Sequence, residues 1–201
     1  MRRHIGRNVV RKDGAAKTAG TARYVDDLTW PGLLHGRTIR SSIPCGEITG
    51  IRFGFDRSGF TVVDAGDIPG RNVVSLITDD QPCLASRLVR HTAEPILLVA
   101  HEDPERLIGA RVEIDYRPGQ PVVDAEKSTH IFKHVQIEKG SLRDGFARAD
   151  LVVEGEYRTG HQEHLYIEPN GMIAVPGDGG VTLYGSLQCP YYVHRALCTL
   201  L

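Results

Sequence analysis

The sequence predicts an α+β protein in two parts, a small mixed sheet with one packed helix followed by a second, α/β part. Three observations support this fold class. Stretches of the first 125 residues alternate apolar and polar side chains or run through β-branched residues, as strands do. A helix start signal stands between two of these strands. A stretch rich in proline and glycine, residues 116–128, then separates them from a second set of strand and helix signals.

The first 32 residues are rich in Gly, Arg and Asp and lack a clear period. They predict an extended, turn-rich arm that ends at the corner formed by Trp30, Pro31 and Gly32. Strands are expected after this corner, and their stretches are 33–42, 48–56, 60–70 and 88–101. The unbroken apolar run at 96–100 predicts a strand that is buried on both faces.

A short helix is expected directly after that strand. Asp103 can cap its N-terminus, Pro104 suits its first position, and Glu105 lies in the first turn, where the helix dipole favours an acid. Strand alternation resumes at Val112. The strand, the helix and the returning strand together predict a crossover unit, and thus a mixed sheet with a helix packed on it.

The second part begins with a linker and a helix over residues 140–150, which Ser141 caps. Strands are expected at 151–159, 171–178 and 180–188, and the latter two form a hairpin.

A second helix is expected after Pro190, and its apolar stripe is formed by Val193, Ala196, Leu197 and Leu200. Because the sequence stops on this stripe with nothing to cover it, we expect an incomplete piece of a longer polypeptide, or a subunit end buried by a partner. The stripe also predicts self-association if these residues are made alone.

Composition limits the classes of function. The 24 Lys and Arg residues nearly balance 25 Asp and Glu residues, and the sequence has no long run of like charges. Nucleic acid is therefore not expected as a partner. The sequence has neither a signal-peptide pattern nor an apolar run of about 20 residues, so we expect a soluble, cytoplasmic protein that does not enter a membrane. Its four cysteines form no C-x-x-C, which predicts buried free thiols and no zinc ribbon or iron-sulfur loop.

Residues 158–175 concentrate polar side chains, among them His161, Glu163, His164 and Glu168. On an extended chain the two histidines, three positions apart, point to opposite faces, which argues against a shared metal ion. The two glutamates are separated in the same way. No nucleophile elbow, P-loop or dinucleotide-binding loop is present. The direct role of the four residues stays open, and a zinc hydrolase built on the histidines remains the weakest alternative.

Four motifs stand in order along the chain. The first is a D-x-x-x-K-x-x-G-x-A-x-Y-x-x-D pattern, formed by Asp13, Lys17, Gly20, Ala22, Tyr24 and Asp27. The others are VRHTAEPILLVA, VEIDYRPGQPVVD and ADLVVEGEYRTGHQEHLYIEP. Together these motifs resemble the molybdenum-binding large subunit of the xanthine dehydrogenase and aldehyde oxidase family. Two departures lie in the first part: Ala93 stands where a glycine usually precedes Glu-Pro, and residues 42–45 read SIPC where the family commonly has Pro-x-Ala-His.

The resemblance implies that residues 1–125 form an N-terminal arm and an α/β hammerhead domain. Residues 126–201 would then be a linker and the incomplete beginning of a molybdopterin-binding domain. Ser186-Leu187-Gln188 matches the family's S-x-Q, whose glutamine amide approaches an oxo ligand of the molybdenum. Gln188 is therefore the one expected cofactor-binding residue. No catalytic residue or metal ligand is expected in this chain, because the family's glycine-rich loop and general-base glutamate would lie beyond position 201.

The function implied is hydroxylation of a purine, another N-heterocycle or an aldehyde, with the 201 residues inactive alone. The intact enzyme would hold a molybdopterin-type cofactor and pass electrons to iron-sulfur clusters and FAD on other domains or subunits. The partners implied are the remainder of the molybdopterin domain, those subunits and a small-molecule substrate, in an oligomer. The alternative is a non-catalytic, truncated docking or assembly module of the same family.

Overall fold

The computed structural model describes residues 5–6, 8–131, 133–167 and 169–201. The chain divides into two compact units. Unit 1 joins Met1–Pro121 with Glu168–Leu201, and unit 2 is Val122–Ile167. The predicted α+β class is confirmed, because unit 1 combines small sheets with short helices.

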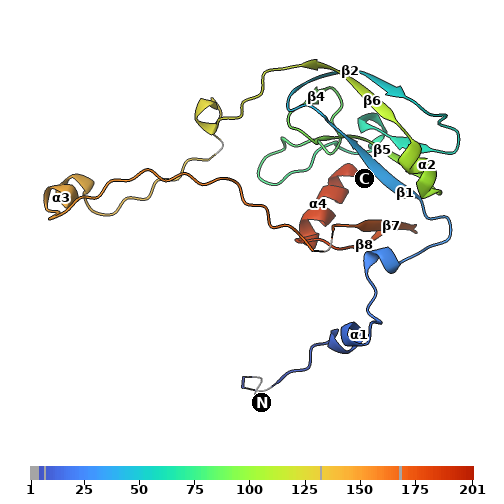
Figure 1. The fold of residues 1–201 in the computed structure, drawn as a ribbon, viewed down its shortest axis with the longest axis horizontal. Coiled ribbons are helices and arrows are strands. Elements are labelled where there is room, and N and C mark those ends of the chain that lie inside the picture. The colour runs from blue at the N-terminus through green and yellow to red at the C-terminus, as the bar shows by residue number, and fades with distance from the viewer. Residues whose placement is uncertain (1–4, 7, 132, 168) are drawn as a thin grey trace. The chain divides into compact units, whose positions relative to one another are not determined.

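Two three-stranded sheets form the centre of unit 1 (Figure 1). The first has the order β1-β5-β3, with bounds His35–Arg40, Pro95–His101 and Thr61–Val63. The second has the order β4-β2-β6, with bounds Leu88–Val89, Gly46–Phe53 and Val112–Pro118. Each of these neighbouring strand pairs is antiparallel. A short 3-10 helix, η2 (Ala65–Asp67), follows β3.

Strand β5 lies at the core of unit 1. Leu97 and Val99 pack with Leu107 in one apolar cluster, while Ile96 packs with Ala85 in another. Consecutive side chains of a strand point to opposite faces. The predicted burial on both faces is thus confirmed at these positions, although Leu98 leaves 38% of its side chain exposed.

Helix α2 (Pro104–Gly109) confirms the predicted start signal, since the Asp103 carboxylate accepts a hydrogen bond from Glu105 N–H at 2.9 Å. The expected crossover within one sheet is wrong. Strand β6 follows α2 but pairs antiparallel with β2, in the sheet that does not contain β5. A parallel return needs a connection of a dozen or more residues. The short α2 segment instead carries the chain from one sheet to the other.

The N-terminal arm contains two short helical turns that the sequence did not indicate. Helix α1 (Gly14–Thr18) forms where the Lys17 ammonium lies 2.8 Å from the Asp13 carboxylate. The 3-10 helix η1 (Val25–Asp27) follows it. A single ion pair between exposed side chains contributes little to the stability of the protein. We therefore regard the turn at α1 as a local feature of the arm.

Three elements from the second half of the sequence belong to unit 1. Strands β7 (Met172–Gly177) and β8 (Gly180–Gly185) form the predicted hairpin, and α4 (Pro190–Leu200) is the predicted helix. The expectation of an uncovered stripe on α4 is wrong, because Val193, Ala196, Leu197 and Leu200 are half-buried. Leu197 and Leu200 line a hollow of about 400 Å³ together with residues of the first sheet.

Unit 2 contains η3 (Ala125–Lys127) and α3 (Leu142–Ala147). Ser141 caps α3 as predicted, accepting a hydrogen bond from Asp144 N–H at 3.2 Å. The strand expected at 151–159 does not form, and residues 151–160 have no regular structure. A strand needs a neighbour for its backbone hydrogen bonds, and alternation of side chains alone does not supply one. Within the described ranges, the structure has no helix both long and apolar enough to cross a membrane.

Candidate functional site

The candidate site is the turn between β8 and α4, residues 186–189. Ser186 N–H donates to the Gly171 carbonyl at 3.1 Å, which ties the start of the turn to the beginning of β7. Pro190 occupies the first position of α4. Proline has no N–H and a fixed φ, so it suits a helix start and prevents β8 from continuing. The turn is therefore held at both of its ends.

Cys189 sets the direction of this turn. Its backbone is left-handed, with φ 52° and ψ 61°, although it is not a glycine. Its carbonyl accepts a hydrogen bond from Tyr192 N–H at 2.9 Å, in the first turn of the helix. Left-handed backbone costs an L-residue about 1–2 kcal/mol, and the surrounding contacts must compensate for that cost.

Gln188 is exposed immediately before this strained residue. Its side-chain amide offers two N–H donors and one acceptor. The adjacent N-terminus of α4, a helix of 11 residues, adds the partial positive charge of a helix dipole. The turn can thus donate a hydrogen bond to a negatively polarised oxygen, and Gln188 itself stays neutral in doing so.

The N-terminal arm packs against the hairpin that leads into this turn. The rings of Trp30 and Tyr184 lie 5.0 Å apart between centroids at an interplanar angle of 43°. The side chain of Val25 lies beside Gly171. Sequence reasoning placed Trp30 only at a corner, and its ring contact with a residue more than 150 positions away has no local signal.

Within the polar segment 158–175, residues 158–167 belong to unit 2, whereas the turn belongs to unit 1. His161, Glu163 and His164 are exposed in unit 2, and His164 N–H donates to the Glu163 carboxylate at 2.9 Å. Glu168 lies outside the described residues. In the part of the chain that the structure covers, no three His, Cys, Asp or Glu side chains gather in a way that could hold a metal ion.

Two family models match the chain. The α/β hammerhead domain of aldehyde oxidase and xanthine dehydrogenase matches residues 19–120, half of the chain. The molybdopterin cofactor-binding domain matches residues 123–201. The chain therefore belongs to the aldehyde oxidase and xanthine dehydrogenase family, the molybdenum hydroxylases, and the predicted resemblance is confirmed.

Two curated relatives are similar over most of the chain. A probable xanthine dehydrogenase subunit of Bacillus subtilis is 32% identical over 90% of this chain and 27% of its own length. The nicotinate dehydrogenase large molybdopterin subunit of Eubacterium barkeri is 30% identical over 94% of this chain and 48% of its own length. The chain thus spans between about a quarter and a half of these oxidoreductases.

Solved structures share the fold at lower identity. The aldehyde oxidoreductase of Desulfovibrio gigas superposes with a TM-score of 0.78 at 23% identity, covering 94% of this chain and 24% of its own. The quinoline 2-oxidoreductase of Pseudomonas putida 86 reaches a TM-score of 0.79 at 20% identity, covering all of this chain and 29% of its own. The fold of this chain is therefore shared with parts of these solved enzymes.

Proposed function

We propose that this chain is the part of a molybdenum hydroxylase that supplies the hammerhead domain and the start of the molybdopterin-binding domain. The reaction proposed is hydroxylation of a purine, another N-heterocycle or an aldehyde. The observation that supports it most strongly is the pair of consecutive family matches, 19–120 and 123–201. The names of the relatives, which include xanthine and nicotinate dehydrogenases, agree with substrates of this class.

The division proposed is an arm and hammerhead domain over residues 1–125, and a linker with the incomplete beginning of the cofactor domain over 126–201. The 201 residues are proposed to be inactive alone, because the relatives are two to four times longer. The partners proposed are the remainder of the molybdopterin domain and the iron-sulfur and FAD domains or subunits, in a cytoplasmic oligomer.

Gln188 is the residue proposed to contact the cofactor. Its exposed amide, held between a strand end and the N-terminus of α4, fits a group rich in polarised oxygens. The bound cofactor supplies the two-electron oxidation chemistry that side chains lack. Gln188 would donate its Nε2–H to an oxygen of that group and help to orient it, from a backbone position fixed by the Ser186–Gly171 hydrogen bond and by Pro190.

Isolation of the protein from its native source tests this function. A polypeptide much heavier than 22.1 kDa that contains molybdenum and co-purifies with iron and flavin is expected. A metal-free species near 22.1 kDa would instead support the non-catalytic docking module. The inactivity of the 201 residues is tested separately, because conversion of xanthine or an aldehyde by the purified chain without other subunits would disprove it.

The role of Gln188 is tested by Gln188→Ala in the assembled enzyme. Loss of a hydrogen bond that orients a metal-bound group typically costs 10- to 100-fold in activity or metal affinity, and we expect a decrease in kcat/KM of about that size. The electron paramagnetic resonance spectrum of the molybdenum should shift as well. Gln120→Ala, at an exposed glutamine beyond β6, is the matched control. An unchanged spectrum and rate in Gln188→Ala would exclude contact with the cofactor.

A further inference from the structure

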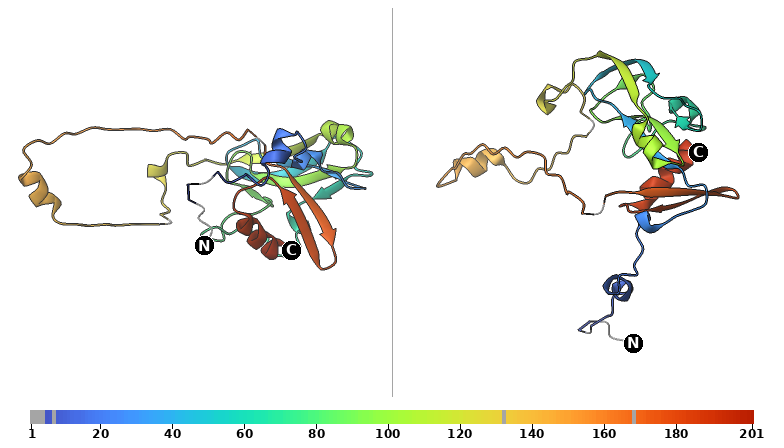
Figure 2. Two further views of the ribbon diagram at one scale, coloured as in Figure 1. Left: turned by 90° about the horizontal axis from the view of Figure 1, so that it is seen from below. Right: turned by 45° about the vertical axis from the view of Figure 1, so that its right-hand side comes forward.

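We infer that a loop of the first half of the chain, residues 69–81, locks helix α4 in place and so positions the turn that carries Gln188. This segment is called the clamp loop below. Gly70 and Arg195 are the positioning residues, one on the loop and one on the helix. Figures 1 and 2 show α4 within unit 1, and its docked end is the C-terminal one.

The clamp loop binds the last carbonyl groups of α4 through its backbone. Gly70 N–H donates to the Leu200 carbonyl at 2.9 Å, and Arg71 N–H donates to the Thr199 carbonyl at 2.8 Å. The carbonyls of a helix's last turn have no partner within the helix itself. The loop therefore bonds directly to the backbone of a helix that begins 120 positions further along the chain.

Gly70 makes this approach possible because it lacks a Cβ. A Cβ built at this position would lie 2.3 Å from the Thr199 carbonyl oxygen and 2.9 Å from the Leu200 carbonyl carbon. Both are backbone atoms, which cannot turn away as a flexible side chain could. Any side chain at position 70 must push the loop and the helix apart.

Arg195 provides a second attachment from the helix side. Its guanidinium donates to the Ser75 carbonyl at 2.6 Å and lies 3.4 Å from the Leu76 carbonyl. Hydrogen bonds from a charged donor are the stronger kind. The helix and the loop are thus connected at two places, through the helix end and through Arg195.

The clamp loop is itself held in one conformation. The Asp79 carboxylate accepts hydrogen bonds from the Ser75 hydroxyl and the Arg71 guanidinium. The Asn72 side chain forms two hydrogen bonds with the backbone of the buried Leu84, at 2.7 and 3.0 Å. The loop is therefore anchored to the protein interior through contacts that do not involve α4.

These polar contacts matter because apolar packing beneath α4 is incomplete. Leu197 and Leu200 face a hollow of about 400 Å³, which Cys83 also lines. Side chains that face an open hollow make fewer dispersion contacts than those in a close-packed core. The two loop amides and Arg195 therefore add polar contacts to the packing of the half-buried Leu197 and Leu200. Since α4 is about 16 Å long, tilting its clamped end displaces the turn at its other end.

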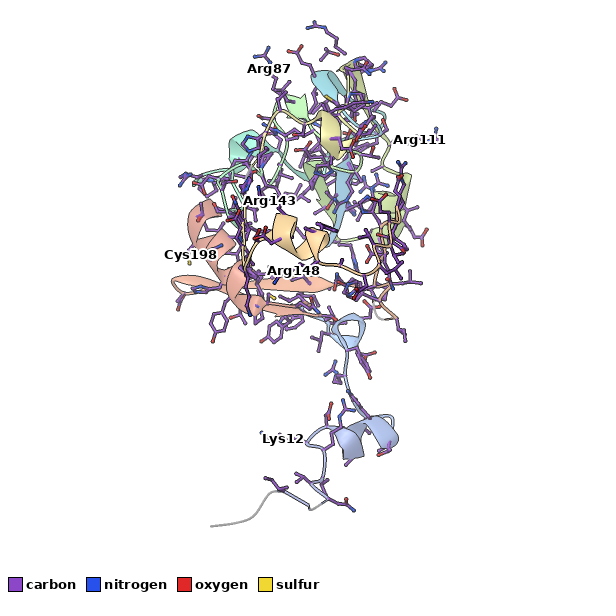
Figure 3. All side chains as sticks on the ribbon, turned by 90° about the vertical axis from the view of Figure 1, so that its left-hand side faces the viewer. Lys12, Arg87, Arg111, Arg143, Arg148 and Cys198 are labelled. Carbon is purple, nitrogen blue, oxygen red and sulfur yellow. The ribbon has the colours of Figure 1, made fainter. Side chains whose placement is uncertain are left out.

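The consequence for Gln188 rests on the proposed function, whereas the docking of α4 does not. The experiment therefore measures docking first, in the 201-residue chain, through the rate at which a thiol reagent modifies Cys83. Peptide mapping by mass spectrometry separates Cys83 from the other cysteines, including the exposed Cys198 labelled in Figure 3. Cys83 is half-buried and lines the hollow together with Leu197 and Leu200, so displacement of α4 should increase its accessibility.

We expect Gly70→Ala and Arg195→Gln each to raise the Cys83 labelling rate about tenfold or more, because local opening becomes more frequent. Arg195→Lys should restore part of the protection, since it keeps a charged donor. Gly109→Ala is the control, because a Cβ there meets nothing within 4 Å. The side-chain amide resonance of Gln188 should shift in the two clamp variants and stay unchanged in the control.

Labelling rates within twofold of wild type in Arg195→Gln would overturn the clamp, and so would a failure of Arg195→Lys to restore protection. If Gly70→Ala does not fold, the two Arg195 variants decide the question. A changed labelling rate with an unmoved Gln188 resonance would refute positioning of the turn. If labelling and resonance both respond while Gln188→Ala leaves the assembled enzyme unaffected, the clamp stands and the cofactor role of Gln188 fails.

Discussion

Replacement of Ala93 by glycine should stabilise the protein. Ala93 has a left-handed backbone, with φ 65°, in the turn between β4 and β5. Its N–H donates to the Ser41 carbonyl at 2.9 Å, and its own carbonyl accepts from the Arg40 guanidinium at 3.0 Å. Both bonds involve backbone atoms of residue 93, so Ala93→Gly keeps them. The methyl group is exposed, and its loss removes no core packing.

The size of the effect follows from two opposing terms. Left-handed backbone costs an L-residue about 1–2 kcal/mol, and glycine removes this cost. Glycine also raises the entropy of the unfolded chain, which offsets about 0.4–1 kcal/mol. A net gain of about 0.5–1 kcal/mol in the free energy of unfolding remains. For a protein of this size that corresponds to roughly 1–4 °C in Tm.

Thermal and urea unfolding of the 201-residue chain measure this gain. The matched control is Ala19→Gly, because Ala19 is exposed like Ala93 but has φ −82°. The control gains nothing from glycine and should lose up to about 1 kcal/mol. If Ala93→Gly lowered Tm as much as Ala19→Gly does, the left-handed backbone at position 93 would carry no strain that glycine relieves. The reasoning would then be refuted.

Three further outcomes are expected. Burial raises the pKa of the Cys83 thiol above its ordinary 9.0, so at pH 8 it should react with iodoacetamide more slowly than Cys189 and Cys198; equal rates would contradict this. Leu97→Ala should lower the free energy of unfolding by about 3 kcal/mol, because Leu97 is 1% exposed in the core; a loss below about 1 kcal/mol in urea unfolding would contradict the packing described. Hydrogen bonds from the Ser75 hydroxyl and then the Arg71 guanidinium lower the pKa of Asp79 below its ordinary 3.8. A carboxyl whose pKa is lowered in the folded state stabilises the fold at pH values above its ordinary pKa. The Tm advantage of wild type over Asp79→Asn should therefore be present at pH 6 and shrink as the pH falls below 3.8. A pH-independent difference would exclude titration of Asp79 as its cause.

The elements that local sequence determines were predictable. Helix α2 begins where Asp103, Pro104 and Glu105 place a cap, a helix start and a favourable charge within three positions. Strand β5 and the β7–β8 hairpin follow in the same way from an apolar run and a glycine-rich turn. In each case the residues that decide the structure are neighbours in the chain.

The elements that depend on distant partners were not predictable. The sequence around α2 indicates a strand, a helix and a further strand but not which sheet that strand joins, and the pairing of β6 with β2 decides this. Alternation at 151–159 likewise indicates a strand, but the described structure offers it no neighbour. The clamp loop shows the same limit, because no local feature of Gly70 reveals a helix end from the other half of the chain.

The candidate site combines both kinds of information. The S-x-Q motif is the reason for proposing Gln188, and Pro190 marked the helix start correctly. The left-handed backbone of Cys189 had no signal, because cysteine is not a residue type that favours it. Its conformation is imposed by the strand, the proline and the first helical turn that surround it.

Unit 1 is formed by two separate segments of the chain, and this has a consequence for synthesis on the ribosome. This unit joins Met1–Pro121 to Glu168–Leu201 and leaves the intervening segment to a unit of its own. The first sheets therefore emerge before the helix that completes the unit. At 5–20 residues per second, about 80 residues of further translation take roughly 4–16 s. During that interval α4 does not yet line the hollow beside Leu98, so we expect the apolar side chains of the first sheet to be more exposed in the nascent chain than after α4 has formed.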